Sequence, residues 1–276
     1  ALPICVYAHE IKYLLQDILR NEWGFDGMVV SDWGGSNSAV AAVKAGGSLE
    51  MPSPGYTSVR ELEGAVKAGT LSEADLNARA AEVAKIAHWT KTEGVGRNDL
   101  LKDAVAAAHH EIARKVAENS SVLLKNASAT LPLQSGTCVA VIGDMAKTPR
   151  FQGSGSSKVN ATREENILDE LKNAAATTGV TVAGYAQGYD RQGAKNQTLI
   201  DEAKTLAAAD TTDAVIAVVG LDERSESEGL DRSTMAIPQA QNDLVDALTA
   251  TGKPVIVVLV AGSPVELPWF DAVSAI

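Results

Sequence analysis

Two stretches of the chain carry carboxylates in positions suited to catalysis. In the first, residues 27–33, a short apolar run (Met-Val-Val) is followed by Ser31, Asp32 and Trp33. The apolar run predicts a strand at 28–31 that is buried on both faces. Because a charged group is not stable unpaired inside such a strand, we expect Asp32 at its carboxyl end. In parallel α/β folds, catalytic residues project from that end.

Both residues also have a structural interpretation. Trp33 offers a flat apolar surface suited to the face of a sugar ring, but an indole at this position could equally fill a core. Asp32 could instead cap the helix that follows. From this stretch alone, the catalytic and the structural interpretations have about equal weight.

The second stretch, residues 221–232, contains three glutamates, two aspartates and two arginines. It follows a predicted strand, and open α/β sheets bind their ligands at the carboxyl edge of the strands. A solvated charged loop is the common alternative, and for an arbitrary protein it would be favoured. The break at Gly229 and the Asp231–Arg232 pair indicate a fixed geometry instead.

Other kinds of site have little support in the sequence. The glycine-rich segment 153–158 lacks the G-x-x-x-x-G-K-[ST] pattern of a phosphate-binding loop, although it could contact a neutral polyol. His9 and His88 are isolated, and His109 and His110 are adjacent on a predicted helix, so they face different directions. No G-x-S-x-G elbow is present for Ser-His-Asp chemistry. We therefore expect neither a metal nor a cofactor, and a carboxylate in each half remains.

Composition limits the partners. The chain has 276 residues, 45% of them hydrophobic, and a net charge of −11, which suits one large or two ordinary domains. The surplus of carboxylates disfavours nucleic acid, which requires clustered Lys and Arg. No apolar run approaches the roughly 20 residues of a membrane span. The chain starts without Met or a signal-like segment, so we expect it to be a piece of something longer.

The elements expected around the first carboxylate alternate between helix and strand. The predicted helices are 11–23, 37–44 (ended by Gly46 and Gly47), 58–68 and 72–92, and a short strand is expected at 49–52. The last helix opens with a capping box from Ser72 to Asp75. The alternation is typical of a barrel, but it supplies too few strands to close one. A break at 94–98 opens a predicted linker, 94–116.

The elements expected around the second carboxylate form βαβ units. The predicted strands are 122–124, 138–142, 180–184, 214–219 and 255–260, and the predicted helices are 163–176, 197–208 and 238–250. Strands separated by single amphipathic helices predict a parallel sheet that is covered on both faces.

Four stretches resemble glycoside hydrolase family 3, of the β-glucosidase type, and together they span most of the chain in the family's order. They are residues 12–33 with their S-D-W end, residues 45–52 (A-G…L-E-M-P), residues 121–126 with 131–133 (S-V-L-L-K-N and L-P-L), and residues 227–232 (S-E-G-L-D-R) with Pro238, Gln241 and Leu244.

The resemblance implies an α/β fold class: the C-terminal portion of a TIM-type (β/α) barrel over 1–93, the linker, and an α/β sandwich with a mostly parallel sheet over 117–276, incomplete at its C-terminus. It also implies an active site between the domains and an exo-acting glycosidase that retains configuration at terminal β-D-glucosyl residues. Asp32 matches the family's nucleophile and Glu228 its acid/base, with Glu226 left open as an alternative. Trp33 would flank the sugar, and Ser154 is a candidate hydroxyl contact.

This chemistry needs two carboxyl groups about 5–5.5 Å apart, one ionised and one protonated at the start. Residues 32 and 228 can meet only if the two domains close face to face. Apposed carboxylates raise each other's proton affinity, and exclusion of water strengthens this effect. We therefore expect Glu228 to titrate higher than Asp32.

Two other functions stay open: a β-xylosidase or another glycosidase on the same scaffold, and a non-catalytic carbohydrate-binding remnant. The expected partner is a small carbohydrate, not nucleic acid or membrane, and the oligomeric state is open. The family's earlier barrel strands do not lie in this chain, so another chain would have to supply them or they are absent. We expect an extracellular or periplasmic location in preference to a cytoplasmic one.

Overall fold

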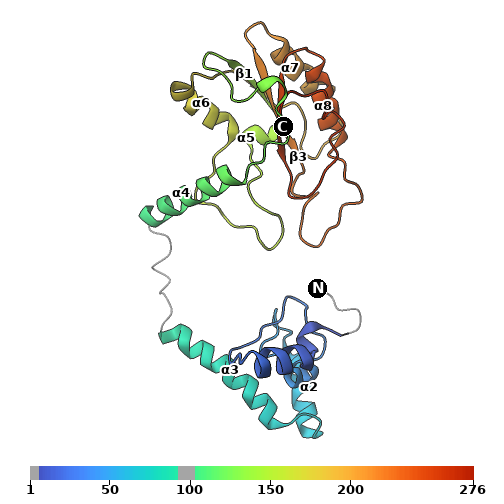
Figure 1. Ribbon diagram of the computed structural model, residues 1–276. Helices are drawn as coiled ribbons and strands as arrows, with labels where there is room; N and C mark the ends of the chain where they lie inside the picture. Colours follow the sequence, from blue (N-terminus) through green and yellow to red (C-terminus); the bar gives the residue numbers. More distant parts are fainter. Residues whose placement is uncertain (1–5, 93–102) are drawn as a thin grey trace. The chain divides into compact units, whose positions relative to one another are not determined.

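The computed structural model describes residues 6–92 and 103–276, and the chain divides into two compact units, Ala1–Lys102 and Asp103–Ile276 (Figure 1). The predicted linker, 94–116, contains residues outside the described ranges together with the first part of helix α4 (Asp103–Ser120). No helix in the described ranges is long and apolar enough to cross a membrane.

The first unit is mostly helical, as the sequence predicts. Its elements are η1 (Ala8–Glu10), the π-helix η2 (Tyr13–Glu22), α1 (Ala39–Ala45), α2 (Tyr56–Lys67) and α3 (Glu73–Thr92). Gly46 ends α1 with a φ of 110°, a left-handed conformation that favours glycine. At the start of α3 the Ser72 hydroxyl accepts a hydrogen bond from the Asp75 N–H at 3.1 Å, which confirms half of the predicted capping box.

The predicted buried strand at 28–31 is wrong in its burial and length. One parallel bridge joins Val30 to Leu49, and the Val30 side chain is 44% exposed. A segment is buried on both faces only when neighbours flank it on both sides. In the described part of this unit, the segment around Leu49 is its one bridged neighbour.

Buried charges hold this short segment in place. The Arg20 guanidinium donates to the carbonyl oxygens of Gly27 (3.2 Å) and Gly46 (2.8 Å), and it pairs with Glu82 of α3 at 2.8 Å. The Ser48 hydroxyl donates to Glu82 at 2.6 Å and accepts from the Val29 N–H at 3.0 Å. Because this ion pair is hydrogen-bonded on several sides, it fixes the segment against α3.

The second unit contains a four-stranded parallel sheet in the order β2-β1-β3-β4, which confirms the prediction of a parallel sheet. The strands are β1 (Cys138–Ile142), β2 (Thr181–Ala186), β3 (Ala214–Gly220) and β4 (Val255–Val260). The helices are α4, α5 (Asp144–Lys147), α6 (Ile167–Thr178), α7 (Gln197–Ala208) and α8 (Gln239–Thr249), and η4 spans Ala127–Ala129.

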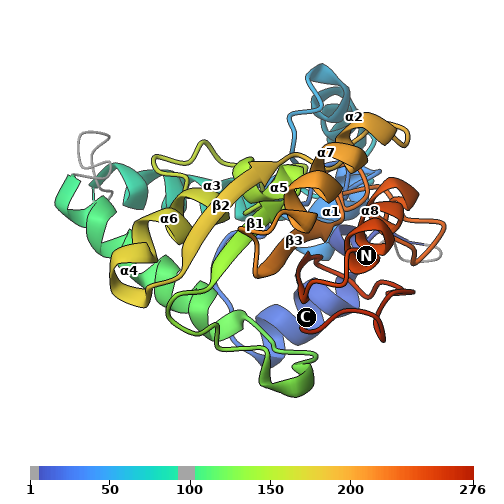
Figure 2. The same cartoon turned by 90° about the horizontal axis from the view of Figure 1, so that it is seen from above.

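Helices cover both faces of the sheet, as the sequence predicts. One core joins α7 and α8 to β1, β3 and β4, and its buried members include Ile142, Ala203 and Leu244. The other joins α5 and α6 to the opposite face through Val141 and Leu168. Figure 2 shows α6 and α8 on opposite sides of the β1–β3 pair.

The predicted strand at 122–124 is wrong. Val122, Leu123 and Leu124 are exposed, and these residues form no ladder. The chain instead makes single contacts with the other end of the unit: the Leu124 N–H donates to the Ile276 carbonyl at 2.9 Å, and Asn126 bridges Ala275.

Candidate active site

The strand order places two loops of the second unit side by side. The chain moves from β1 to β2 on one side and then returns to β3 on the other, so β1 and β3 are neighbours at a point where the order reverses. Crevices that bind ligands form outside the carboxyl ends of strands at such a point. The segment between β1 and α6, which begins with the short helix α5 and is called the β1 loop below, contains the glycine-rich residues 153–158. The loop after β3 contains residues 221–232.

These two loops meet at Glu228. Ser154 and Ser227 form a parallel bridge, and the Glu228 N–H donates to the Ser154 carbonyl oxygen at 3.1 Å. The Ser156 N–H donates to Glu228 Oε2 at 2.6 Å. The structure thus brings Glu228 and Ser154 together through the backbone of Ser154.

Gly155 makes this approach sterically feasible. Its φ is +102°, and a Cβ atom there would lie 2.5 Å from the Cβ of Glu228 and 2.8 Å from its Oε2. Real Cβ atoms do not approach other atoms so closely, and positive φ is itself costly for a residue with a side chain. Only glycine therefore fits between the two loops at this point.

The proton affinity of Glu228 differs from the expectation. Hydrogen bonds from the Ser156 side chain and backbone lower the pKa of this carboxyl, and Glu228 is exposed to solvent. The expected increase depended on a second carboxylate and on exclusion of water. Within the second unit the nearest polar partners are donors instead, and donors stabilise the ionised form.

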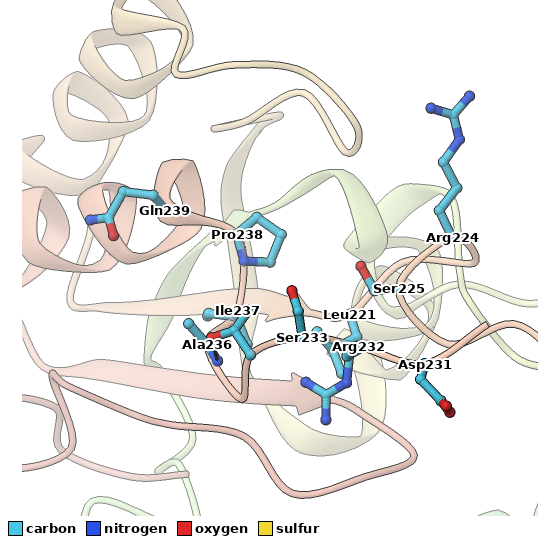
Figure 3. A pocket seen from close by; sticks show the side chains of 11 residues that line it. Leu221, Arg224, Ser225, Asp231, Arg232, Ser233, Ala236, Ile237, Pro238 and Gln239 are labelled. Carbon is cyan, nitrogen blue, oxygen red and sulfur yellow. Dashed lines mark hydrogen bonds between the residues drawn. The ribbon is translucent and has the colours of Figure 1, made fainter.

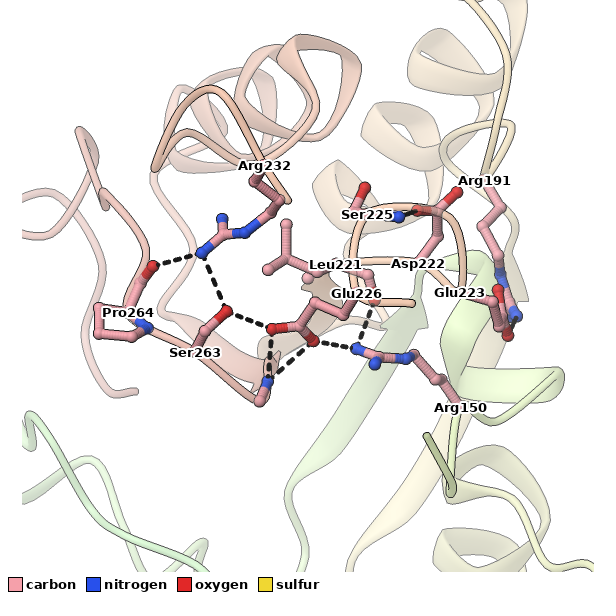
Figure 4. A network of polar contacts seen from close by, with 12 residues as sticks. Arg150, Arg191, Leu221, Asp222, Glu223, Ser225, Glu226, Arg232, Ser263 and Pro264 are labelled. Atoms are coloured by element: carbon pink, nitrogen blue, oxygen red, sulfur yellow. Dashed lines mark hydrogen bonds and ion pairs between the residues drawn. The ribbon is translucent and has the colours of Figure 1, made fainter. Parts of the chain in front are cut away.

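Glu226 is held differently from Glu228. Its carboxylate forms an ion pair with Arg150 and accepts hydrogen bonds from the Ser263 hydroxyl and from the Gly262 N–H, at 2.9 and 3.0 Å (Figure 4). The Glu226 and Arg150 side chains are only 13% and 9% exposed. Burial raises the pKa of Glu226, but the bonds from Ser263, Arg150 and Gly262 outweigh it, so the net pKa is lowered.

Further contacts anchor the rest of this loop. Arg150 also donates to the Leu221 carbonyl at 3.1 Å. At the other end of the loop, Arg232 donates to the Ser263 hydroxyl and to the Pro264 carbonyl, both at 2.9 Å (Figure 4). The Asp222 carboxylate is buried and accepts the Ser225 N–H at 2.8 Å. These bonds give the charged loop the fixed geometry that the sequence analysis expected.

A cavity of about 520 Å³ opens beside the same loop (Figure 3). Its lining includes Arg224, Asp231, Arg232 and Gln239. Neither Glu228 nor Ser154 lines it, so this hollow is separate from the carboxylate that the sequence singled out.

Asp32 and Trp33 belong to the first unit, where both side chains are exposed, Trp33 by 67%. Asp32 directly follows the bridged segment, and its Oδ1 accepts the Trp33 N–H at 2.7 Å. The other Asp32 oxygen has no hydrogen-bond partner among the described residues. Trp33 therefore does not fill a core within this unit, and Asp32 does not cap α1.

The cap of α1 comes from other residues. The Ser38 hydroxyl accepts the Ala41 N–H at 3.2 Å. Glu10 accepts the Ser38 N–H at 2.7 Å, and Glu61 accepts the Ser38 hydroxyl at 2.6 Å. Because these groups satisfy the start of the helix, α1 does not use the carboxylate of Asp32 as a cap.

The buried Ser31 fixes the backbone just before Asp32. Its hydroxyl accepts the Met51 N–H at 2.8 Å and donates to the Met51 carbonyl at 3.3 Å. The Gly34 N–H donates to the same carbonyl at 3.2 Å. The turn that presents Asp32 is thus tied on both sides to one residue of the neighbouring segment.

Sequence reasoning missed Arg150, Ser156, Ser263 and Ser31 as supporting residues. The glycine pattern at 153–155 pointed to the loop of Ser156, and Ser31 lies within the S-D-W stretch. Nothing in the pattern around Arg150 or Ser263 indicates that they meet Glu226, since 76 and 37 positions separate them from it. In the described ranges, no group of three or more His, Cys, Asp or Glu is placed to hold a metal ion.

Comparison with protein families matches both units. The Glycosyl hydrolase family 3 N terminal domain matches residues 6–86, and the Glycosyl hydrolase family 3 C-terminal domain matches residues 121–276. Both stretches with the candidate carboxylates fall inside these matches.

Known proteins resemble the chain over nearly all its length. The thermostable beta-glucosidase B of Acetivibrio thermocellus is 40% identical over 98% of this chain and 35% of its own length. The exo-alpha-(1->6)-L-arabinopyranosidase of Bifidobacterium longum is 36% identical over 96% of this chain and 35% of its own. The chain therefore spans about a third of the length of these curated relatives.

A solved structure, the GH3 beta-glucosidase of Bifidobacterium adolescentis, matches 98% of this chain and 38% of its own with a TM-score of 0.83 and 36% identity. This likeness confirms the predicted fold class, a part of a barrel followed by an α/β sandwich.

Proposed function

The chain belongs to glycoside hydrolase family 3, and from this premise we propose that it forms part of an exo-acting β-glucosidase that retains anomeric configuration. Asp32 is the nucleophile, and Glu228 is the acid/base. Trp33 flanks the sugar, and Ser154 lies at the acid/base. The substrate is a small β-glucoside or a β-linked oligosaccharide with a terminal glucosyl residue. The 40% identity with a curated β-glucosidase supports this substrate class.

The chemistry proceeds in two displacements. Asp32 attacks the anomeric carbon while Glu228 gives its proton to the leaving oxygen, which yields a covalent glucosyl–Asp32 ester and the free alcohol. Glu228, now ionised, takes a proton from water as the water attacks the anomeric carbon. The ester bond breaks, and glucose leaves with its original β configuration.

The contrast between the two glutamates carries the assignment of Glu228. Both oxygens of the Glu226 carboxylate accept bonds from Arg150, Gly262 or Ser263, so neither is turned toward a substrate oxygen. Glu228 uses Oε2 for Ser156 and keeps an exposed second oxygen. An exposed oxygen on a positioned carboxyl is what proton transfer to a substrate needs.

The pKa of Glu228 has to rise when substrate is bound. The Ser156 hydrogen bonds lower it in the second unit alone. A sugar that displaces water from the Glu228 carboxyl would favour its protonated form. We propose that substrate binding supplies this change.

One relative of this chain supports L-arabinopyranose as a second sugar at the cleaved position. The Bifidobacterium longum relative, 36% identical to this chain, is named for its action on α-1,6-linked L-arabinopyranosyl residues. Pyranosides other than glucose therefore belong in the substrate panel, together with the β-xylosides that the sequence analysis left open.

The test uses the full-length product of the gene with p-nitrophenyl β-D-glucoside, β-D-xyloside and α-L-arabinopyranoside. We expect the highest kcat/KM on the glucoside, and a fall of at least about 1000-fold in Asp32→Ala because the nucleophile is lost. Asp26→Ala is the matched control, since Asp26 is exposed and pairs with Lys85 at 2.8 Å. Sugar binding without hydrolysis by the unsubstituted protein would instead establish the carbohydrate-binding remnant.

A further inference from the structure

Glu226 lies where three loops of the second unit meet. Its own loop follows β3, Arg150 lies in the loop after β1, and Gly262 and Ser263 lie in the loop after β4. These are three adjacent strands of the sheet. One carboxylate therefore ties together the segments that follow β1, β3 and β4 (Figure 4).

The contacts to Glu226 and those to Glu228 join the same pair of loops. Arg150 connects the start of the β1 loop to Glu226, and Ser156 connects its glycine-rich tip to Glu228. Between the two glutamates, Ser227 bridges Ser154. A shift of the β3 loop at Glu226 would thus move Glu228 relative to its donor.

Burial makes the Glu226 contacts costlier to break than those of a surface ion pair. Its side chain is 13% exposed and that of Arg150 is 9% exposed, and donors meet the carboxylate from the backbone and from Ser263. A largely buried pair that is also hydrogen-bonded is strongly disturbed when one partner is removed, because the other charge is left uncompensated. The loop therefore has one well-defined position while the pair is intact.

We propose that Glu226, held by Arg150, Ser263 and Gly262, is a positioning residue that fixes the acid/base Glu228 in the orientation required for proton transfer. The proposal rests on the proposed function. In this role Glu226 acts through the loop that it shares with Glu228 and not by contact with the reacting atoms.

The test compares substrates with different leaving groups in the full-length product. Methyl β-D-glucoside needs protonation of its leaving oxygen, whereas 2,4-dinitrophenyl β-D-glucoside does not. We expect Glu226→Gln to lower kcat/KM on the methyl glucoside by roughly 10- to 100-fold and to leave it within about twofold on the dinitrophenyl glucoside, as for partial loss of acid catalysis. Equal losses on both substrates would overturn the proposal, because a general structural defect affects both.

The same substitution in a protein that already lacks the acid/base distinguishes a positioning role of Glu226 from an independent role in catalysis. In a Glu228→Gln protein, Glu226→Gln should produce less than about a twofold further loss on the methyl glucoside, because the two residues act as one unit. The same fold loss as in the wild-type background would overturn the proposal. The matched control is Glu223→Gln, a glutamate of the same loop that pairs with Arg191 at 3.0 Å and should leave both substrates unaffected.

Azide distinguishes this proposal from the proposed function. Azide attacks the glucosyl ester without a general base, so Glu228→Ala should turn over the dinitrophenyl glucoside faster with azide and release β-glucosyl azide. If Glu226→Ala gives that product instead, Glu226 is the acid/base and the positioning role is wrong. If neither variant does and Glu228→Ala keeps full activity, the assignment of Glu228 fails first. Should Glu226→Gln not fold, Ser263→Ala must show the same dependence on leaving group to a smaller extent.

Discussion

The two candidate carboxylates are presented in opposite ways. Asp32 follows directly on a strand-like segment, and its side chain is bonded within the described residues to the adjacent Trp33 N–H alone. Glu228 lies eight positions after the end of β3, in a loop, and its carboxylate is held by a second loop through Ser156. The proposed nucleophile thus depends on backbone pairing, whereas the proposed acid/base depends on contacts between loops.

This difference follows from what each group must do. A nucleophile attacks one atom from one direction, so a rigid segment suits it. An acid/base must give up a proton and then take one back, so its pKa has to change between steps. A loop whose carboxylate is held by replaceable donors allows such a change, provided that the loop itself is anchored. In this protein the anchor is the buried Glu226–Arg150 pair.

Among the substitutions that test this contrast, Gly155→Ala should have the largest effect on activity. The new Cβ would lie 2.5 Å from the Cβ of Glu228, at a φ of +102°. We expect kcat/KM on methyl β-D-glucoside to fall by about 10- to 100-fold, with a smaller loss on the dinitrophenyl substrate, because acid catalysis is impaired. Steady-state kinetics of the full-length product measure both values.

Gly153→Ala is the matched control for this substitution. Its Cβ would meet only the Ser157 hydroxyl, at 3.0 Å, which can rotate away. It should behave as wild type. If Gly155→Ala also keeps its activity on the methyl glucoside, the glycine-rich loop does not position Glu228.

The comparison also shows which parts of the structure a sequence can predict. Helix α7 and strand β4 begin and end where their periodicity and flanking residues indicate, because local propensity and burial agree there. The prediction of a buried strand at 28–31 was wrong, because burial depends on neighbouring strands that the local hydrophobic pattern does not describe.

The candidate site divides in the same way. Asp32 could be proposed from the S-D-W stretch, and Glu228 from the family resemblance of residues 227–232, since both signals lie in local sequence. Arg150 and Ser263 were not, because their contact with Glu226 arises only when three strands align in the sheet. The lowered pKa of Glu228 was also missed, because it depends on hydrogen bonds from the side chain and the backbone of Ser156, in another loop.

A smaller effect is expected from Ser31→Ala, which tests the other side of the contrast. The substitution removes the hydroxyl that bonds both polar backbone groups of Met51. We expect the free energy of unfolding to fall by about 1–3 kcal/mol, because the Met51 N–H loses its partner in a partly buried position. Urea unfolding of the full-length product measures this loss.

Kinetics on the two glucosides complete this experiment. Because Asp32 acts on every substrate, any loss of activity in Ser31→Ala should be the same for methyl and dinitrophenyl β-D-glucoside. Ser53→Ala is the control, since the Ser53 hydroxyl makes only an exposed 3.3 Å contact with the Gly55 N–H. A loss confined to the methyl glucoside would show that Ser31 acts on proton transfer, and the contrast between the two carboxylates would then be wrong.

The smallest expected effect is a change of stability with pH that depends on Glu226. Hydrogen bonds and the Arg150 charge lower its pKa in the folded protein below the ordinary value of 4.5, against the opposing effect of burial. A carboxyl with a lowered folded pKa stabilises the folded state fully above its unfolded pKa, and this stabilisation is lost as the pH falls through the folded pKa. The difference in unfolding free energy between wild type and Glu226→Gln should therefore be largest near pH 7 and shrink below about pH 4.5.

Urea titrations at several pH values measure this difference, with Glu223→Gln as the reference for removing one carboxylate from this loop. A difference that stays constant or grows in acid would mean that the Glu226 charge does not hold the loop, and the anchored-loop explanation of how Glu228 is presented would have to be replaced.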